Sequence, residues 1–190
     1  MTTKMLFAIS MMLLFSVGLF AQVPKMTVYR DVKFPFSISY DAEEWEVVPS
    51  SYAEGRFRVG SKPLMGMTEF NILVRKPPVP LTEEGLIKMY TDTKQDFLNG
   101  FVNSNIPGTK ILDSGTTFIS SRKAVYIKNS YIMKNLDEEI DLTTYQAMFV
   151  YEGHLYILNY RAPSELFNHL FSDFKDLTSG FILRSAIKTK

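Results

Sequence analysis

The 190-residue sequence contains no cysteine, only two histidines and a single tryptophan. Without cysteine there are no disulfide bonds, no thiol catalysis and no N-terminal lipid attachment. The two histidines, His154 and His169, do not fall at a spacing with Asp or Glu that is typical of a zinc site. We interpret both as histidines without a catalytic role, so the sequence predicts no metal site.

The short motifs of the common enzyme classes are also missing. There is no Gly-x-Ser-x-Gly elbow, no phosphate-binding loop and no dinucleotide fingerprint, because the glycines are dispersed. The acidic residues gather in two short groups that lack the spacing of a calcium loop, and we interpret them as solvated turns: Asp41, Glu43 and Glu44, and Asp137, Glu138, Glu139 and Asp141. The sequence therefore predicts a protein that is not an enzyme, with no catalytic residue and no cofactor.

Charge is almost absent from the N-terminal segment. Lys4 is the only charged residue before Lys25, and Leu6 to Phe20 is nearly all apolar. An apolar helix of about fifteen residues spans roughly 23 Å, less than a bilayer core of about 30 Å, so a secretory signal peptide is favoured over a membrane anchor. We predict a signal peptide at residues 1–21, cleaved between Ala21 and Gln22, and no stable membrane insertion afterwards.

The remaining residues, 22–190, carry no net charge. Removing residues 1–21 removes Lys4 alone and leaves 20 basic and 20 acidic residues. A balanced chain has no electrostatic footprint for nucleic acid or an anionic membrane surface. No repeat or long linker interrupts it, so we expect one globular domain with a core large enough to need no disulfide.

Alternating and aromatic-rich segments predict strands at 34–40, 45–48, 57–59, 70–74, 110–118, 124–133, 143–151, 154–160 and 181–183. One helix is expected from Thr82, as its N-cap, to Gly100, and a second from Ser164 to Gly180. The second helix carries an apolar stripe that we expect to cover the sheet: Leu166, Phe167, Leu170, Phe171, Phe174 and Leu177. Trp45 is expected to be buried in its strand.

The hairpin around Glu152 and Gly153 indicates how the layers are arranged. Its first strand is apolar on both faces, with Ala147 and Phe149 on one side and Met148 and Val150 on the other. A strand that is apolar on both faces is covered on both faces. The predicted fold is therefore of the α/β (α+β) class, a mostly antiparallel sheet flanked by helices in a three-layer α/β/α sandwich.

Three segments resemble the PsbP-like and DcrB-like superfamily: FSISYDAEEWEV, GHLYILNYRAP and LFNHLFSDFKDLTSGFIL. The resemblance covers Phe34 to Leu183, and Asp41 stands where the superfamily usually has proline. It implies an antiparallel sheet between helices and a protein that acts by binding, without a shared set of catalytic residues. The Ala-Gln junction resembles signal peptides of Bacteroidetes, which implies a bacterial periplasmic or secreted protein.

Two segments are candidate interaction loops. The first is methionine-rich and adaptable, and the second places apolar residues among asparagines: Leu64, Met65 and Met67, and Phe101, Val102 and Ile106. The alternative is that both fold back onto the core.

The leading interpretation is an exported periplasmic or secreted, non-enzymatic binding or accessory protein. Its partner would be an unknown envelope protein or a small apolar ligand. An envelope hydrolase with a site assembled from dispersed residues is the alternative, and a structural subunit with a flat apolar patch is a third class. Convergent ionisable groups in a pocket would favour the enzyme, and apolar walls would favour binding.

Overall fold

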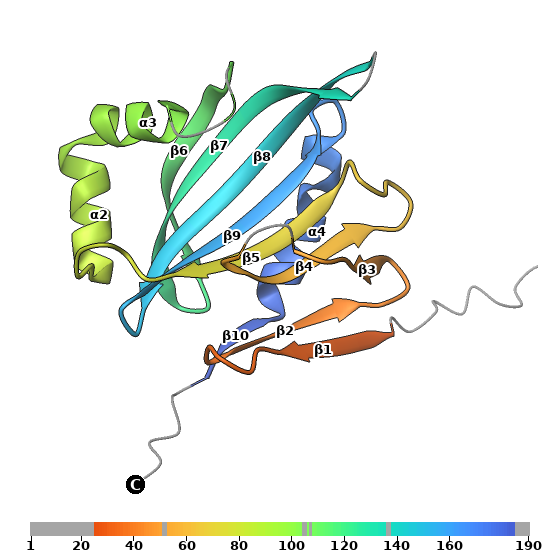
Figure 1. The fold of residues 1–190 in the computed structure, drawn as a ribbon, viewed down its shortest axis with the longest axis horizontal. Coiled ribbons are helices and arrows are strands. Elements are labelled where there is room, and N and C mark those ends of the chain that lie inside the picture. Colours follow the sequence, from red (N-terminus) through yellow and green to blue (C-terminus); the bar gives the residue numbers. More distant parts are fainter. Residues whose placement is uncertain (1–24, 51–52, 104–105, 107, 136–137, 185–190) are drawn as a thin grey trace, which may run out of the picture.

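The computed structural model describes residues 25–50, 53–103, 106, 108–135 and 138–184, which form ten strands and three helices (Figure 1). The predicted signal peptide at residues 1–21 and its cleavage site lie outside the described residues. The strands are β1 Met26–Arg30, β2 Phe36–Asp41, β3 Trp45–Val47, β4 Gly55–Ser61, β5 Glu69–Arg75, β6 Lys110–Ile119, β7 Arg122–Asn135, β8 Glu138–Tyr151, β9 His154–Pro163 and β10 Phe181–Leu183. The helices are α2 Glu83–Asp92, α3 Lys94–Asn103 and α4 Phe167–Ser179.

Seven strands form the main sheet, in the order β3-β4-β5-β9-β8-β7-β6, and every pairing in it is antiparallel. The predicted hairpin of β8 and β9 is confirmed. Its two turn residues, Glu152 and Gly153, have φ angles of 48° and 71°. Two positive φ angles are typical of a turn whose twist matches that of the strands it joins.

Both faces of the main sheet are covered. On one face, Met148 and Val150 pack in a cluster with Leu86 and Tyr90 of α2. On the other face, Phe149 packs in a larger cluster with residues of α4. The alternation expected in β8 is therefore confirmed.

A second, three-stranded sheet of order β1-β2-β10 shares the α4 side of the molecule (Figure 1). Phe36 and Ile38 of β2 are fully buried against the main sheet. Strand β1 was not predicted, because MTVYR is exposed along most of its length and lacks a strong apolar alternation. The mostly antiparallel architecture is confirmed, while the three-layer sandwich stays a prediction beside this additional sheet.

The prediction of one helix from Thr82 to Gly100 was wrong in part. Thr82 is the N-cap, and its Oγ1 accepts a hydrogen bond from the Gly85 amide at 3.0 Å. The helix is broken at Thr93, whose φ of −129° and ψ of 42° are not helical. The break lets α2 contact β7 and β8 while α3 contacts β6. Gly100 then lies inside α3, not at a helix end.

Helix α4 lies at the predicted apolar stripe, but it begins at Phe167 and not at Ser164, because residues 164–166 form a turn after β9. Phe167, Phe174 and Leu177 are buried, while Leu166, Leu170 and Phe171 are half-buried at the edge of the contact with the sheet. Gly180 ends the helix because the chain there passes very close to β2. A Cβ on Gly180 would lie 2.6 Å from the carbonyl oxygen of Ser39, closer than real Cβ contacts.

Candidate functional site

The first candidate loop is the turn between β4 and β5. Leu64 and Met67 are half-buried, Met65 is 50% exposed, and the amides of Met67 and Thr68 both donate to the Leu64 carbonyl at 3.0 Å. The segment is thus a closed turn. Its role in binding stays a prediction.

The second candidate loop is largely helical. Phe101 and Val102 lie in the last turn of α3 and are half-buried, and Phe101 packs against the α2 cluster. Ile106 is 45% exposed. The expectation that Phe101 and Val102 lie in a loop was wrong, because α3 continues to Asn103 and its apolar side chains pack in the α2 cluster.

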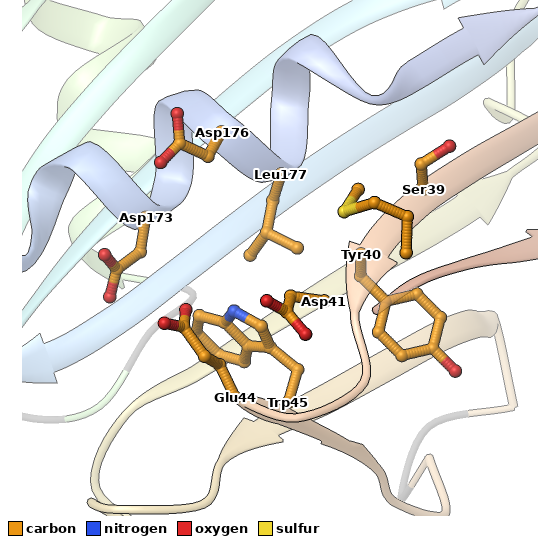
Figure 2. A pocket seen from close by; sticks show the side chains of 9 residues that line it. Ser39, Tyr40, Asp41, Glu44, Trp45, Asp173, Asp176 and Leu177 are labelled. Atoms are coloured by element: carbon orange, nitrogen blue, oxygen red, sulfur yellow. The ribbon is translucent and has the colours of Figure 1, made fainter. Parts of the chain in front are cut away.

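A cavity of about 310 Å³ lies between α4 and the turn that joins β2 to β3 (Figure 2). Apolar side chains form its floor and acidic side chains surround them. The lining residues are Met26, Ser39, Tyr40, Asp41, Glu44, Trp45, Asp173, Asp176 and Leu177. We call this the acidic cavity.

This cavity was not predicted from the sequence. Asp41 and Glu44 were interpreted as a solvated turn, and Asp173 and Asp176 lie outside the apolar stripe predicted for the last helix. The one available signal was the position of the single tryptophan, Trp45, directly after the acidic turn. The packing of α4 beside β2 brings the two acidic pairs together.

Backbone hydrogen bonds hold the turn in place. The Asp41 carboxylate accepts a hydrogen bond from the Glu43 amide at 2.8 Å, which is typical of a turn begun by aspartate. The Lys62 amide donates to the Glu44 carbonyl at 2.9 Å. The Lys62 ammonium donates to the Ala42 carbonyl at 2.7 Å, so this nearby cation is directed at a backbone oxygen.

Trp45 is 5% exposed and Leu177 is 3% exposed, so the floor belongs to the core. Figure 2 shows the Asp173 side chain on α4 pointing across the cavity toward Glu44 and Trp45. A carboxylate beside an aromatic ring and an aliphatic side chain is only partly hydrated. The cavity therefore combines negative charge with a surface that water solvates poorly.

The four carboxylates have no cationic partner in the described part of the chain, where all five ion pairs lie elsewhere. Burial, followed by the negative charges of Glu44 and Asp176, raises the pKa of the Asp173 carboxyl above its ordinary value. Hydrogen bonding with the Tyr160 hydroxyl acts in the opposite direction. Asp173 is thus an acid whose charge is incompletely compensated.

Neither histidine lines the acidic cavity. His154 Nδ1 lies 2.9 Å from the Glu152 carbonyl and its ring packs edge-on against Phe34, while His169 is exposed on α4. Within the described ranges, no group of three His, Cys, Asp or Glu residues is placed to hold a metal ion.

The same ranges contain no helix long and apolar enough to cross a membrane. Asp137, from the second acidic group, lies outside the described residues.

Comparison with known proteins relates the chain to a fold. No family model matches the sequence, and no curated protein matches it either. The solution structure of CyanoP, the cyanobacterial PsbP of Synechocystis, superposes with a TM-score of 0.57 at 15% identity, covering 88% of this chain and 95% of CyanoP. The chain has the PsbP-like fold.

A PsbP-like fold is shared with a crystal structure from Bacteroides thetaiotaomicron, at a TM-score of 0.52 and 10% identity. That match covers 80% of this chain and 46% of the other chain. At such low identity the similarity establishes architecture alone. The kind of ligand that the acidic cavity binds therefore depends on this chain's own residues.

In this protein we expect Asp173→Asn to raise the melting temperature at pH 7 by roughly 1 to 3 °C. The raised pKa of Asp173 means that its ionised form costs stability in the folded state. That cost disappears as the pH falls through the raised pKa, so the two proteins should converge in acid. Calorimetry across this pH range measures the difference, and a lower melting temperature for the variant at pH 7 would contradict it.

Proposed function

We propose that this protein is an exported, non-enzymatic binding protein of the periplasm or the cell exterior, whose acidic cavity binds an organic cation with an apolar portion. The carrying observation is that Asp41, Glu44 and Asp173 surround the buried Trp45 without a cationic partner among the described residues. A positively charged ligand would neutralise the carboxylates, and its apolar portion would contact Trp45 and Leu177.

The aromatic floor supports a cation over a neutral ligand. The faces of aromatic rings attract positive charge, and tryptophan does so most strongly. The partner expected from the sequence is a small apolar ligand or an envelope protein. The carboxylates favour a ligand that carries an amine or a quaternary ammonium group, or a partner protein that offers a basic side chain. They disfavour nucleic acid, because it is anionic.

Export rests on the N-terminal sequence. Residues 1–21 carry the short positive start, the apolar stretch and the small final residue of a secretory signal. The absence of cysteine excludes lipid attachment after cleavage. We therefore place the protein outside the cytoplasm as a free domain.

The single tryptophan makes the binding test specific, because Trp45 lies at the floor of the cavity. Choline should change the fluorescence of Trp45 with saturation, and added salt should weaken the effect. Dimethylbutanol, the neutral carbon isostere of choline, should bind about tenfold more weakly or not at all, because it cannot neutralise the carboxylates. An equal response to both compounds, or none to choline, would contradict the proposal.

Three variants test whether choline binds in the acidic cavity. Asp173→Asn and Glu44→Gln should each weaken choline binding, since each removes a carboxylate from the cavity. Glu165→Gln removes an exposed carboxylate in the turn before α4, away from the cavity lining, and should bind choline as the wild type does. Loss of binding in all three would indicate a general charge effect.

A second candidate function is glycoside hydrolysis by the same cavity. It is favoured by the convergence of carboxyl groups in the cavity and by the raised pKa of Asp173 beside Glu44, because glycosidases use a protonated and an ionised carboxyl group. Incubation with oligosaccharides and chromatography of the products tests it. Cleavage that is lost in Asp173→Asn would favour the hydrolase, and choline binding without cleavage would favour the binding protein.

A further inference from the structure

A row of polar residues crosses the face of the main sheet that α2 and α3 cover. The helices pack over apolar residues of neighbouring strands, among them Leu73, Ile157 and Met148. On the same face, the residues that follow these apolar ones along the strands are polar. They lie opposite one another on the neighbouring strands β4, β5, β9 and β8. We call them the polar strip: Arg58, Glu69, Asn71, Asn159, Arg161 and Thr144.

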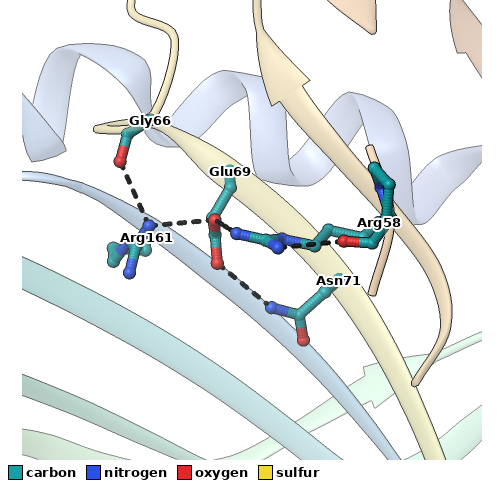
Figure 3. Close-up of polar contacts among 6 residues, drawn as sticks. Arg58, Gly66, Glu69, Asn71 and Arg161 are labelled. Carbon is teal, nitrogen blue, oxygen red and sulfur yellow. Dashed lines mark hydrogen bonds and ion pairs between the residues drawn. The ribbon is translucent and has the colours of Figure 1, made fainter. Parts of the chain in front are cut away.

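Two guanidinium groups in the polar strip share one carboxylate (Figure 3). Arg58 Nη2 lies 2.7 Å from Glu69 Oε2, and Arg161 Nη2 lies 2.9 Å from the same oxygen. The side chain of Glu69 is 9% exposed, and those of Arg58 and Arg161 are 25% and 17% exposed. This largely buried group therefore carries one positive charge in excess, and a charge in such a place favours an anionic partner.

Several polar atoms beside this ion pair have no hydrogen-bond partner among the residues that the structure describes. They include Nε of both Arg58 and Arg161, and Asn71 Oδ1, Asn159 Oδ1 and Thr144 Oγ1. Asn71 and Thr144 are 3% and 4% exposed, so neither water nor a ligand reaches these atoms unless neighbouring side chains move. Buried polar groups are nearly always hydrogen-bonded in folded proteins, and a cluster of exceptions on one face indicates groups that a ligand would satisfy.

We propose that the polar strip is a second binding site, for an acidic sugar: a ligand with one carboxylate and several hydroxyl groups. One carboxylate balances the excess positive charge. Hydroxyl groups both donate and accept, which suits a mixture of amide oxygens and a threonine hydroxyl. A ligand with two or more negative charges would leave its own charge unbalanced.

The geometry assigns Arg58 as the arginine that leaves Glu69 and binds the ligand carboxylate. It is the more exposed of the two, and its Nη1 donates to the Pro49 carbonyl at 3.0 Å. Arg161 Nη2, the nitrogen that contacts Glu69, also donates to the Gly66 carbonyl at 3.2 Å, which ties Arg161 to the turn between β4 and β5. When the ligand carboxylate enters, Arg58 turns from Glu69 to the ligand and uses Nε and Nη2 together, a bidentate geometry that strengthens such pairs. Arg161 keeps Glu69, so each cation then has its own anion.

Calorimetric titration with three probes tests the site. Glucuronate carries both the carboxylate and the hydroxyl groups, glucose carries only hydroxyl groups, and cyclohexanecarboxylate carries only the carboxylate. Glucuronate should bind about tenfold or more tightly than either of the others, because each lacks one kind of partner. Equal affinity for all three, or no binding of glucuronate, would overturn the proposal.

Variants and NMR spectra place the ligand. Arg58→Gln should weaken glucuronate binding about tenfold or more, while its melting temperature should stay within roughly 3 °C of the wild type, because Glu69 and Arg161 remain a neutral pair. Arg75→Gln is the matched control, an exposed arginine on β5, and should bind normally. In the wild type, glucuronate should shift the Nε–H signals of Arg58 and Arg161. Normal binding by Arg58→Gln, or unshifted signals, would overturn the proposal.

The polar strip and the acidic cavity are independent sites with opposite charge. Asp173→Asn should leave glucuronate binding unchanged, and Arg58→Gln should leave choline binding unchanged. Failure of one site therefore does not count against the other.

Discussion

Replacing Phe174 with aspartate is expected to leave the protein unfolded. Phe174 is 4% exposed on the sheet side of α4, and its ring lies 6.2 Å from Phe70, 4.9 Å from Tyr145 and 6.1 Å from Tyr160. Loss of a buried phenylalanine costs about 3 to 5 kcal/mol through the cavity it leaves. An unpaired buried carboxylate adds about 3 to 5 kcal/mol more, and the total approaches the whole stability of a typical domain, about 5 to 15 kcal/mol.

Circular dichroism and NMR spectra measure this outcome against two controls. Phe174→Leu keeps most of the volume and should cost roughly 1.5 kcal/mol or less. His169→Asp places the same charge on the exposed face of α4 and should change stability by less than about 0.5 kcal/mol. Phe171→Asp should be milder than Phe174→Asp, because Phe171 is only half-buried. A folded Phe174→Asp variant with an unchanged melting temperature would mean that α4 is not docked on the sheet.

Trp45→Ala is expected to destabilise the protein by about 3 to 5 kcal/mol. The indole is 5% exposed and belongs to the core cluster between the main sheet and α4. Strand β3 has only three residues and pairs with β4 alone, with Trp45 opposite Ser61. Few other contacts hold this strand, so the loss of its one large buried side chain should not be compensated locally.

Urea unfolding followed by circular dichroism measures the free energy of unfolding without the tryptophan signal. Glu46→Ala is the control, since the next residue in β3 is exposed and should change stability by less than about 0.5 kcal/mol. Trp45→Phe should keep most of the stability and still weaken choline binding, because it removes part of the aromatic floor. A cost below about 1 kcal/mol for Trp45→Ala would show that β3 does not pack on the core.

Local sequence patterns predicted most elements of the fold. Alternation predicted the strands of the main sheet, and the Glu152–Gly153 turn predicted the pairing of β8 with β9. The N-cap at Thr82 and the apolar stripe of α4 were also found from sequence, because capping and helical periodicity depend on residues a few positions apart. The break at Thr93 was not found, since it depends on how α2 and α3 fit the sheet beneath them.

The two candidate sites were decided by tertiary structure. Asp41 and Glu44 join Asp173 and Asp176 because α4 crosses beside β2, more than 120 residues further along the chain. In the same way, Glu69 faces Arg161 because β5 pairs with β9 in one particular register. A sequence pattern determines which face of its own strand or helix a side chain occupies, within a few residues. Which distant residue lies opposite is determined by the packing that buries the whole core, and that is why the sequence alone indicated the fold class and the tertiary structure alone showed the sites.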